Sequence, residues 1–182
     1  MANIDLLKRI RDKVVADPDT LDMNDWFLVP VKGLDVGTLD FGLEEIPCGT
    51  TACIAGWATL LSGDRLQVLN EGFEEKHNSS TIYIPGFDPG GTHSPRSVQS
   101  VPDRATELLD LPRALARWLY VIDNEDVVWV LDQLIAGRNT MSDLPGLMAE
   151  EHYRVDARYM ARHNHADPIP TAGVEETDDD QH

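Results

Sequence analysis

The chain contains little cysteine, because only 2 of its 182 residues are Cys. Two cysteines are too few for a disulfide framework, so the composition excludes the small disulfide-stapled secreted proteins and agrees with a reducing compartment. Long apolar runs are also lacking, since no stretch approaches the roughly 18 residues of a membrane span. The opening segment alternates charged and apolar residues and has no signal-peptide pattern. We therefore expect a cytoplasmic protein with no membrane partner.

Basic residues are scarce as well: 15 Lys and Arg occur beside 32 Asp and Glu, which gives a formal net charge of −17. Six of the acids follow Arg162, where neither Lys nor Arg occurs, so the chain before Asp167 still carries −11. A field of this sign repels nucleic-acid phosphates and attracts basic protein surfaces. We therefore predict no direct nucleic-acid binding and a partner protein with a basic surface.

The size and hydrophobicity of the chain fit one compact domain, since 182 residues with 42% hydrophobic content can bury a core. After Asn164 the sequence has too few apolar residues to offset the entropy of ordering. The predicted organisation is a single globular domain over residues 1–165 and a disordered acidic tail over residues 166–182.

The first helix is predicted over Ile4–Ala16, because apolar residues recur there at helical spacing and Asn3 can cap its start. Its outer face is basic within an acidic protein, which predicts an acidic neighbour on the same chain or on a partner. An internal counter-charge is the simpler interpretation. The residues of this face are Lys8, Arg9, Arg11 and Lys13.

Short strands are predicted in the first half of the chain. Residues 21–47 alternate Gly and Pro with short apolar pieces, which favours strands or ordered loop over helix. Arg65–Leu69 and Ser80–Pro85 flank a polar, turn-like segment and predict a small antiparallel hairpin, with Phe27–Val31 at its edge. The Gly- and Pro-rich segment Gly86–Pro102 predicts a long mobile loop. Its polar residues Asp88, His93 and Arg96 are candidate binding residues.

The second half of the chain shows apolar recurrence at helical spacing, with Pro and Gly as punctuation. Trp118 and Trp129 lie on the apolar faces and are predicted to be core aromatics. The predicted helices are Asp103–Leu109, Pro112–Ile122, Glu125–Ala136 and Pro145–His163.

A central helix is predicted over Cys48–Gly63. Small residues recur along one stripe, and larger apolar residues, among them Trp57, fill most of the remaining circumference. A helix that is apolar nearly all round is buried, and the small stripe lets another backbone approach closely. The stripe consists of Ala52, Ala55, Gly56 and Thr59.

Both cysteines lie at the start of this predicted helix. If Gly49 is the N-cap, Cys48 and Cys53 occupy the two positions that meet in a hydrophobic staple. This interpretation makes both thiols structural, together with Ala52, Gly56 and Trp57. In the alternative, Cys48 is a catalytic nucleophile whose thiol pKa is lowered by the helix dipole. Its base would be one of His77, His93, His152, His163 and His165.

A metal site is a further alternative on the last predicted helix. His152 and Asp156 are four residues apart and share one face, and His163 lies two turns further on. The glutamate of the usual zinc-protease motif is absent, and the two cysteines do not have the spacing of a zinc knuckle. We therefore predict no metal and no other cofactor.

Two motifs carry a resemblance to a known group of proteins. The segment "CGTTACIAGWA" (residues 48–58) and the later helix "ATELLDLPRALARWLY" (residues 105–120) resemble small uncharacterised bacterial and bacteriophage proteins with a C-G-T-x-x-C-I-A-G-x-A motif. The resemblance covers a minority of the chain. It implies a mobile-element or accessory context and no particular catalysis.

The predicted fold class is α+β and mostly α-helical, with a central small-residue helix, a small antiparallel hairpin and a C-terminal helical array. The leading functional hypothesis is a non-enzymatic accessory or regulatory protein, encoded by a phage, that binds a host protein through an acidic surface. Two alternatives are a thiol- or metal-dependent enzyme that uses Cys48 or the His152/His163 helix, and an inhibitor whose carboxylates mimic DNA phosphates.

Overall fold

The structure is a computed structural model, and it describes residues 2–72, 75–79, 81–83, 98–138, 140, 142–143 and 145–150. The chain divides into two compact units, Met1–Leu147 and Met148–His182. Only Met148, Ala149 and Glu150 of the second unit are described, so the predicted boundary at residue 165 and the acidic tail lie outside the described residues. Within the described part, no helix is both long and apolar enough to cross a membrane.

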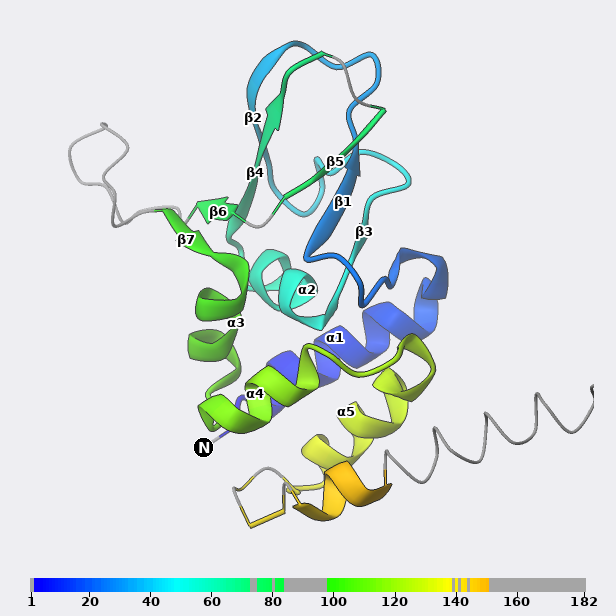
Figure 1. The fold of residues 1–182 in the computed structure, drawn as a ribbon, viewed down its shortest axis with the longest axis vertical. Coiled ribbons are helices and arrows are strands. Elements are labelled where there is room, and N and C mark those ends of the chain that lie inside the picture. Colours follow the sequence, from blue (N-terminus) through cyan, green and yellow to red (C-terminus); the bar gives the residue numbers. More distant parts are fainter. Residues whose placement is uncertain are drawn as a thin grey trace, which may run out of the picture. The chain divides into compact units, whose positions relative to one another are not determined.

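The first unit combines helices with antiparallel sheets, so the predicted mixed α+β class is confirmed (Figure 1). Two short 3-10 helices, η1 (Pro18–Thr20) and η2 (Asn124–Asp126), accompany the longer ones. Residues 145–150 are helical too. The longer helices are α1 (Ile4–Ala16), α2 (Ile54–Leu61), α3 (Val101–Leu109), α4 (Arg113–Leu119) and α5 (Val127–Ile135).

The described strands form two antiparallel sheets. One sheet has the order β3-β1-β5 and the other has the order β2-β4-β6-β7. The strands are β1 (Phe27–Pro30), β2 (Gly37–Phe41), β3 (Thr51–Ala52), β4 (Arg65–Asn70), β5 (Lys76–Asn78), β6 (Thr81–Tyr83) and β7 (Val98–Ser100).

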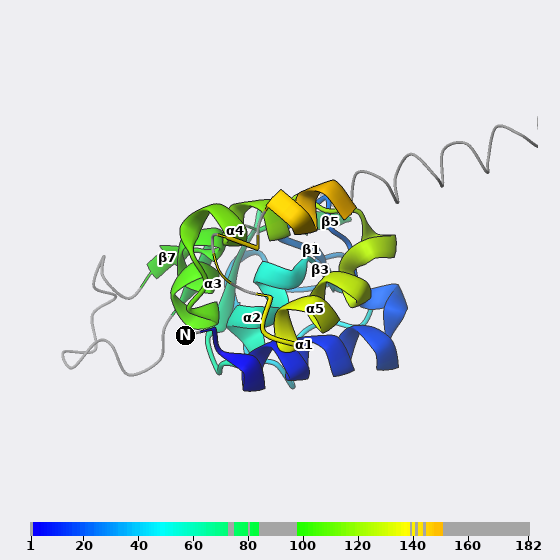
Figure 2. The same cartoon turned by 90° about the horizontal axis from the view of Figure 1, so that it is seen from below.

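Helix α1 has the predicted bounds, and the side chain of Asn3 accepts a hydrogen bond from the N–H of Leu6 at its start. Its basic face finds counter-charges within the chain: Arg11 lies 2.5 Å from Asp132 of α5, and Lys13 lies 2.7 Å from Asp17. Figure 2 shows α1 lying across α2 and α5. Part of the basic face of α1 therefore forms ion pairs within the chain, and one of these pairs joins α1 to α5.

The predicted strand pairing is right in part. β4 pairs with β6, with Arg65 opposite Tyr83. The segment between them is not only a turn, because it contains β5, whose three polar residues gave no strand pattern. The prediction that residues 27–31 join the edge of β4 is wrong: β1 pairs with β3 and β5, and β2 takes that edge. β1 buries Phe27 and Val29, and the ring of Phe27 lies against Gly56 of α2.

The predicted long loop at 86–102 ends earlier than expected. Residues 98–100 form β7, and α3 begins at Val101, where the hydroxyl of Ser100 accepts a hydrogen bond from the N–H of Asp103. A side-chain cap at Ser100 allows Pro102 to occupy the first turn, where a missing N–H costs nothing. The remainder of the predicted loop, including Asp88, His93 and Arg96, lies outside the described residues.

Helix α2 is buried on every side, since each residue from Ile54 to Leu60 is buried. It packs against α1, α3, β3 and β4. The predicted close approach occurs at Gly56, where a Cβ atom would collide with the backbone carbonyl oxygen of Trp26. The predicted start at Cys48 is wrong: Cys53 is the N-cap, because Thr51 and Ala52 pair with β1 instead of continuing the helix.

Candidate functional site

The buried thiol of Cys53 belongs to the core. Its side chain is 1% exposed, and burial raises its pKa to about 11, although nearby backbone N–H groups oppose the shift. A thiol with this pKa stays protonated at neutral pH and is a poor nucleophile. The predicted structural role of Cys53 agrees with this environment, as does that of Trp57, which is fully buried.

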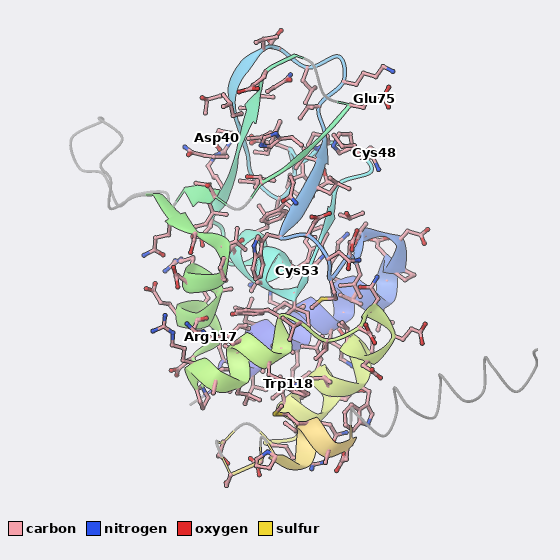
Figure 3. All side chains as sticks on the ribbon, in the orientation of Figure 1. Asp40, Cys48, Cys53, Glu75, Arg117 and Trp118 are labelled. Atoms are coloured by element: carbon pink, nitrogen blue, oxygen red, sulfur yellow. The ribbon has the colours of Figure 1, made fainter. Side chains whose placement is uncertain are left out.

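The second thiol, Cys48, has a different environment. It is exposed on the turn that leads into β3, next to Gly49, whose φ of +84° is left-handed. The staple prediction is wrong because α2 begins only at Ile54, so Cys48 neither packs as a structural residue nor lies at the positive end of the helix dipole. Figure 3 shows Cys48 on the turn that leads into β3 and Cys53 at the start of α2.

The two environments predict very unequal labelling by a thiol reagent. In the native protein at pH 8, we expect Cys48 to react at least roughly a hundredfold faster than Cys53, because the latter is buried and almost entirely protonated. Mass spectrometry of the labelled chain measures both rates. The urea-unfolded protein, in which both thiols should react, is the control. Fast labelling of native Cys53 would contradict the burial.

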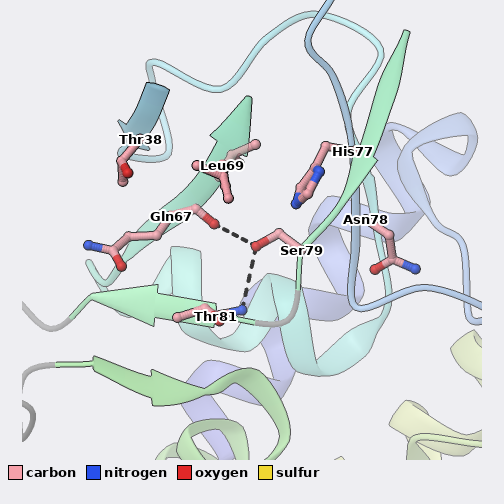
Figure 4. A pocket seen from close by; sticks show the side chains of 8 residues that line it. Thr38, Gln67, Leu69, His77, Asn78, Ser79 and Thr81 are labelled. Carbon is pink, nitrogen blue, oxygen red and sulfur yellow. Dashed lines mark hydrogen bonds between the residues drawn. The ribbon is translucent and has the colours of Figure 1, made fainter. Parts of the chain in front are cut away.

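A polar cavity of about 300 Å³ lies where β4, β5 and β6 meet. In Figure 4 the side chain of His77 points toward it from β5, and Ser79 lies at its centre. The hydroxyl of Ser79 donates to the carbonyl oxygen of Gln67 at 2.5 Å and is 3.5 Å from the N–H of Thr81. The other lining residues are Thr38, Val68, Leu69 and Asn78.

The hydroxyl of Ser79 in this polar cavity is not poised as a nucleophile. Its hydrogen is directed at the backbone carbonyl of Gln67, and the described residues that line the cavity include no Asp or Glu. The structure does not bring Cys48 to His77 either: β3, which follows Cys48, and β5, which carries His77, lie on opposite sides of β1.

The predicted metal ligands cannot be placed. His152, Asp156 and His163 lie outside the described residues, as do the alternative bases His93 and His165. Among the residues that are described, no group of three or more His, Cys, Asp or Glu side chains is arranged to hold a metal ion.

A second cavity, which we call the acidic cavity, joins two segments that are distant in the sequence. Its volume is about 400 Å³, and its walls come from residues 23–26, before β1, and from residues 120–121, after α4. The aromatic rings of Trp26 and Tyr120 meet there edge to face, with centroids 5.7 Å apart and an interplanar angle of 85°. The remaining lining residues are Met23, Asn24, Asp25 and Val121.

Hydrogen bonds hold the walls of the acidic cavity in place. The side-chain oxygen of Asn124 accepts the N–H of Met23 at 2.8 Å and so ties the two segments together. The carbonyl oxygen of Asp25 accepts the N–H of Cys53 at 3.2 Å, which anchors the loop to the start of α2. The side-chain amide of Asn78 donates to the carboxylate of Asp25. The cavity is therefore formed before any ligand arrives.

The two segments that form the acidic cavity carry acidic residues and no basic ones. Neither residues 18–31 nor residues 118–137 contain a Lys or an Arg. Both segments carry exposed or half-buried carboxylates within four positions of the lining residues, and since no basic residue is interleaved with them in sequence, a negative potential is expected there. These carboxylates belong to Asp19, Asp22, Asp25, Asp123 and Glu125.

The tyrosine in this cavity is buried and uncharged. Burial raises the pKa of Tyr120 to about 12, and its hydroxyl lies 3.2 Å from that of Thr106. Tyr120 is a neutral phenol at neutral pH, and because it is 5% exposed only a small part of its ring faces the cavity. Sequence reasoning missed the cavity, because Trp26 and Tyr120 are 94 positions apart and each alone has only the signal of an ordinary core aromatic.

Comparison with known proteins adds no relative, because no protein-family model, no curated protein and no solved structure matches the chain.

Proposed function

We propose that this chain is a non-enzymatic accessory or regulatory protein that binds a host protein through the acidic surface around the acidic cavity. The observation that carries the proposal is a preformed cavity with aromatic walls, flanked by carboxylates from two segments that contain no basic residue. Preformed concave sites with a few polar groups are the usual places of ligand binding. Oriented charge around such a site selects a partner of the opposite sign.

Several features support binding over catalysis. Cys53 is protonated and buried, Cys48 is separated from His77 by a strand, and Ser79 donates to a carbonyl. The phage origin in this proposal comes only from the motif at residues 48–58. A cytoplasmic location and a C-terminal helical array are parts of the same proposal, supported by the two free cysteines and by helices α3, α4 and α5.

The proposal predicts a salt-sensitive association with basic ligands. Octalysine should associate with the immobilised full-length chain, and its association rate should fall at least about tenfold as the ionic strength rises from about 20 mM to about 500 mM, because salt screens the field. Octaglutamate and a 20-base-pair DNA duplex should not bind. Surface plasmon resonance at each salt concentration measures all three.

Two variants of equal charge locate the surface. In the first, Asp22→Asn, Asp123→Asn and Glu125→Gln remove three carboxylates beside the acidic cavity. In the second, Asp35→Asn, Glu71→Gln and Glu75→Gln remove three near the other end of β1. The first should slow the association of octalysine about fivefold more than the second, because steering depends on the local field. Equal slowing, failure of octalysine to bind, or salt-sensitive binding of the duplex would contradict the proposal.

A further inference from the structure

We propose that the acidic cavity receives an arginine side chain of the basic partner. This inference deepens the proposed function and depends on it, since it names the residue type that the cavity selects. A volume of about 400 Å³ has room for one extended arginine side chain together with some water. The walls, the charge and the rim of the cavity each favour this occupant.

The aromatic walls suit a planar cation. Trp26 and Tyr120 meet at 85°, and the half-buried indole of Trp26 supplies most of the aromatic surface, since Tyr120 is 5% exposed. A guanidinium group is planar and weakly hydrated, and it stacks on such faces in cation–π contacts more often than the ammonium group of lysine does. The ring of Tyr120 is held by burial and by the contact between its hydroxyl and that of Thr106.

The carboxylate of Asp25 supplies the counter-charge within the same lining. Its side chain is held by the amide of Asn78, and its backbone is held by Cys53, so it does not have to be ordered on binding. Guanidinium groups bind carboxylates in a planar, often bidentate geometry that an ammonium group cannot reproduce. Asp22 and Asp123, on the two flanking segments, add to the negative potential at the cavity.

The rim of the cavity offers apolar cover for the aliphatic stem of the arginine. Val121 is 77% exposed, and it lines the cavity together with Met23. An arginine stem lying against these two side chains would remove their apolar surface from water. Because hydrogen bonds already fix the cavity walls, binding would not have to overcome the ordering of a loop.

Three heptapeptides test the inference on the full-length chain. Each has three Lys residues on either side of a central position, which is Arg, Lys or the uncharged analogue citrulline. We expect the Arg peptide to bind about fivefold to tenfold more tightly than the Lys peptide, which has the same charge, because only Arg stacks and pairs in the plane. The citrulline peptide should bind most weakly. Isothermal titration calorimetry at about 50 mM ionic strength gives the three affinities.

Two variants assign this preference to the cavity. Trp26→Leu should bind the Arg and Lys peptides equally, because the stacking surface is lost. Tyr120→Phe, which keeps the ring and removes only the hydroxyl, should retain the preference. In the unmodified protein, the NMR signal of the Trp26 indole N–H should change its chemical shift more on titration with the Arg peptide than the signals of the other three tryptophans. This signal is identified by its absence from the spectrum of Trp26→Phe. This readout does not require Trp26→Leu to fold.

The possible results separate the two proposals. If the Arg and Lys peptides bind equally and with salt-sensitive rates, the arginine site is overturned and the acidic binding surface is retained. A preference for Arg that persists in Trp26→Leu, or an unshifted Trp26 indole, also overturns the arginine site. If none of the peptides binds, the proposed function itself fails.

Discussion

Gly56→Ala is expected to lower the free energy of unfolding by about 3 kcal/mol, and Gly56→Leu to leave the chain largely unfolded at 25 °C, because both overpack a buried helix contact. A Cβ atom at Gly56 would collide with the carbonyl oxygen of Trp26 and lie 2.9 Å from the Cβ of Ala52 and 3.0 Å from the ring of Phe27. The carbonyl belongs to the backbone next to β1 and cannot rotate away as a flexible side chain would. The whole strand would have to move from α2.

The matched control is Gly146→Ala, which is also a glycine-to-alanine change within a helical segment. Among the described residues, a Cβ atom there would meet the guanidinium of Arg138 at 3.3 Å, which is the far end of a flexible side chain. The higher helix propensity of alanine should make this variant neutral or more stable by up to about 1 kcal/mol. Urea denaturation followed by circular dichroism gives both values. A Gly56→Ala variant as stable as the parent would contradict the close contact between α2 and the segment before β1.

Arg104→Met is expected to cost about 3 kcal/mol, because it leaves the carboxylate of Asp64 buried without its cation. Asp64 follows the glycine that ends α2 and is 3% exposed, while Arg104 belongs to α3. The guanidinium contacts both carboxylate oxygens, with Nε at 2.9 Å and Nη2 at 3.3 Å. This pair connects the end of the central helix to the helix that packs on it.

The double variant Asp64→Leu with Arg104→Met should recover most of the lost stability, because it removes the buried charge together with its partner. An exposed pair provides the control: Lys32 and Glu75 lie 2.6 Å apart but are both about three-quarters exposed, so Lys32→Met should change the stability by less than about 0.5 kcal/mol. Guanidinium chloride denaturation of the single and double variants forms a double-mutant cycle. If the losses in the free energy of unfolding of the two single variants add up in the double variant, the two groups do not depend on each other.

Both predictions bear on the acidic cavity, because α2 supports one of its walls. The backbone of Trp26 lies against Gly56, and the N–H of Cys53 at the start of α2 donates to the carbonyl of Asp25. A variant that moves α2 should therefore change the positions of Trp26 and Asp25 as well. For this reason the binding tests use substitutions at surface carboxylates and at side chains that line the cavity, and leave α2 unchanged.

Features that depend on neighbours a few positions away could be predicted from the sequence. Helix α1 has its predicted bounds, because its apolar spacing and the Asn3 cap are local signals. The helices α3, α4 and α5 lie within two residues of their predicted starts for the same reason. The burial of Cys53 and Trp57 also followed from a segment that is apolar on nearly all sides. In each case a period of 3.6 residues or a capping residue carries the information within one or two turns.

Features that depend on partners far along the chain could not be predicted and became visible in the folded structure. Residues 51–52 form β3 and not the first turn of a helix, because β1 offers them hydrogen-bond partners some 24 positions earlier. β5 is a polar strand that exists by pairing with β1, and its sequence contains no alternation to reveal it. The acidic cavity requires Trp26 and Tyr120 to meet, together with the bond from Met23 to Asn124. Periodicity in the sequence indicates which face of an element is buried but not which element covers that face. The strand partners and the cavity walls therefore depend on the fold of the whole chain.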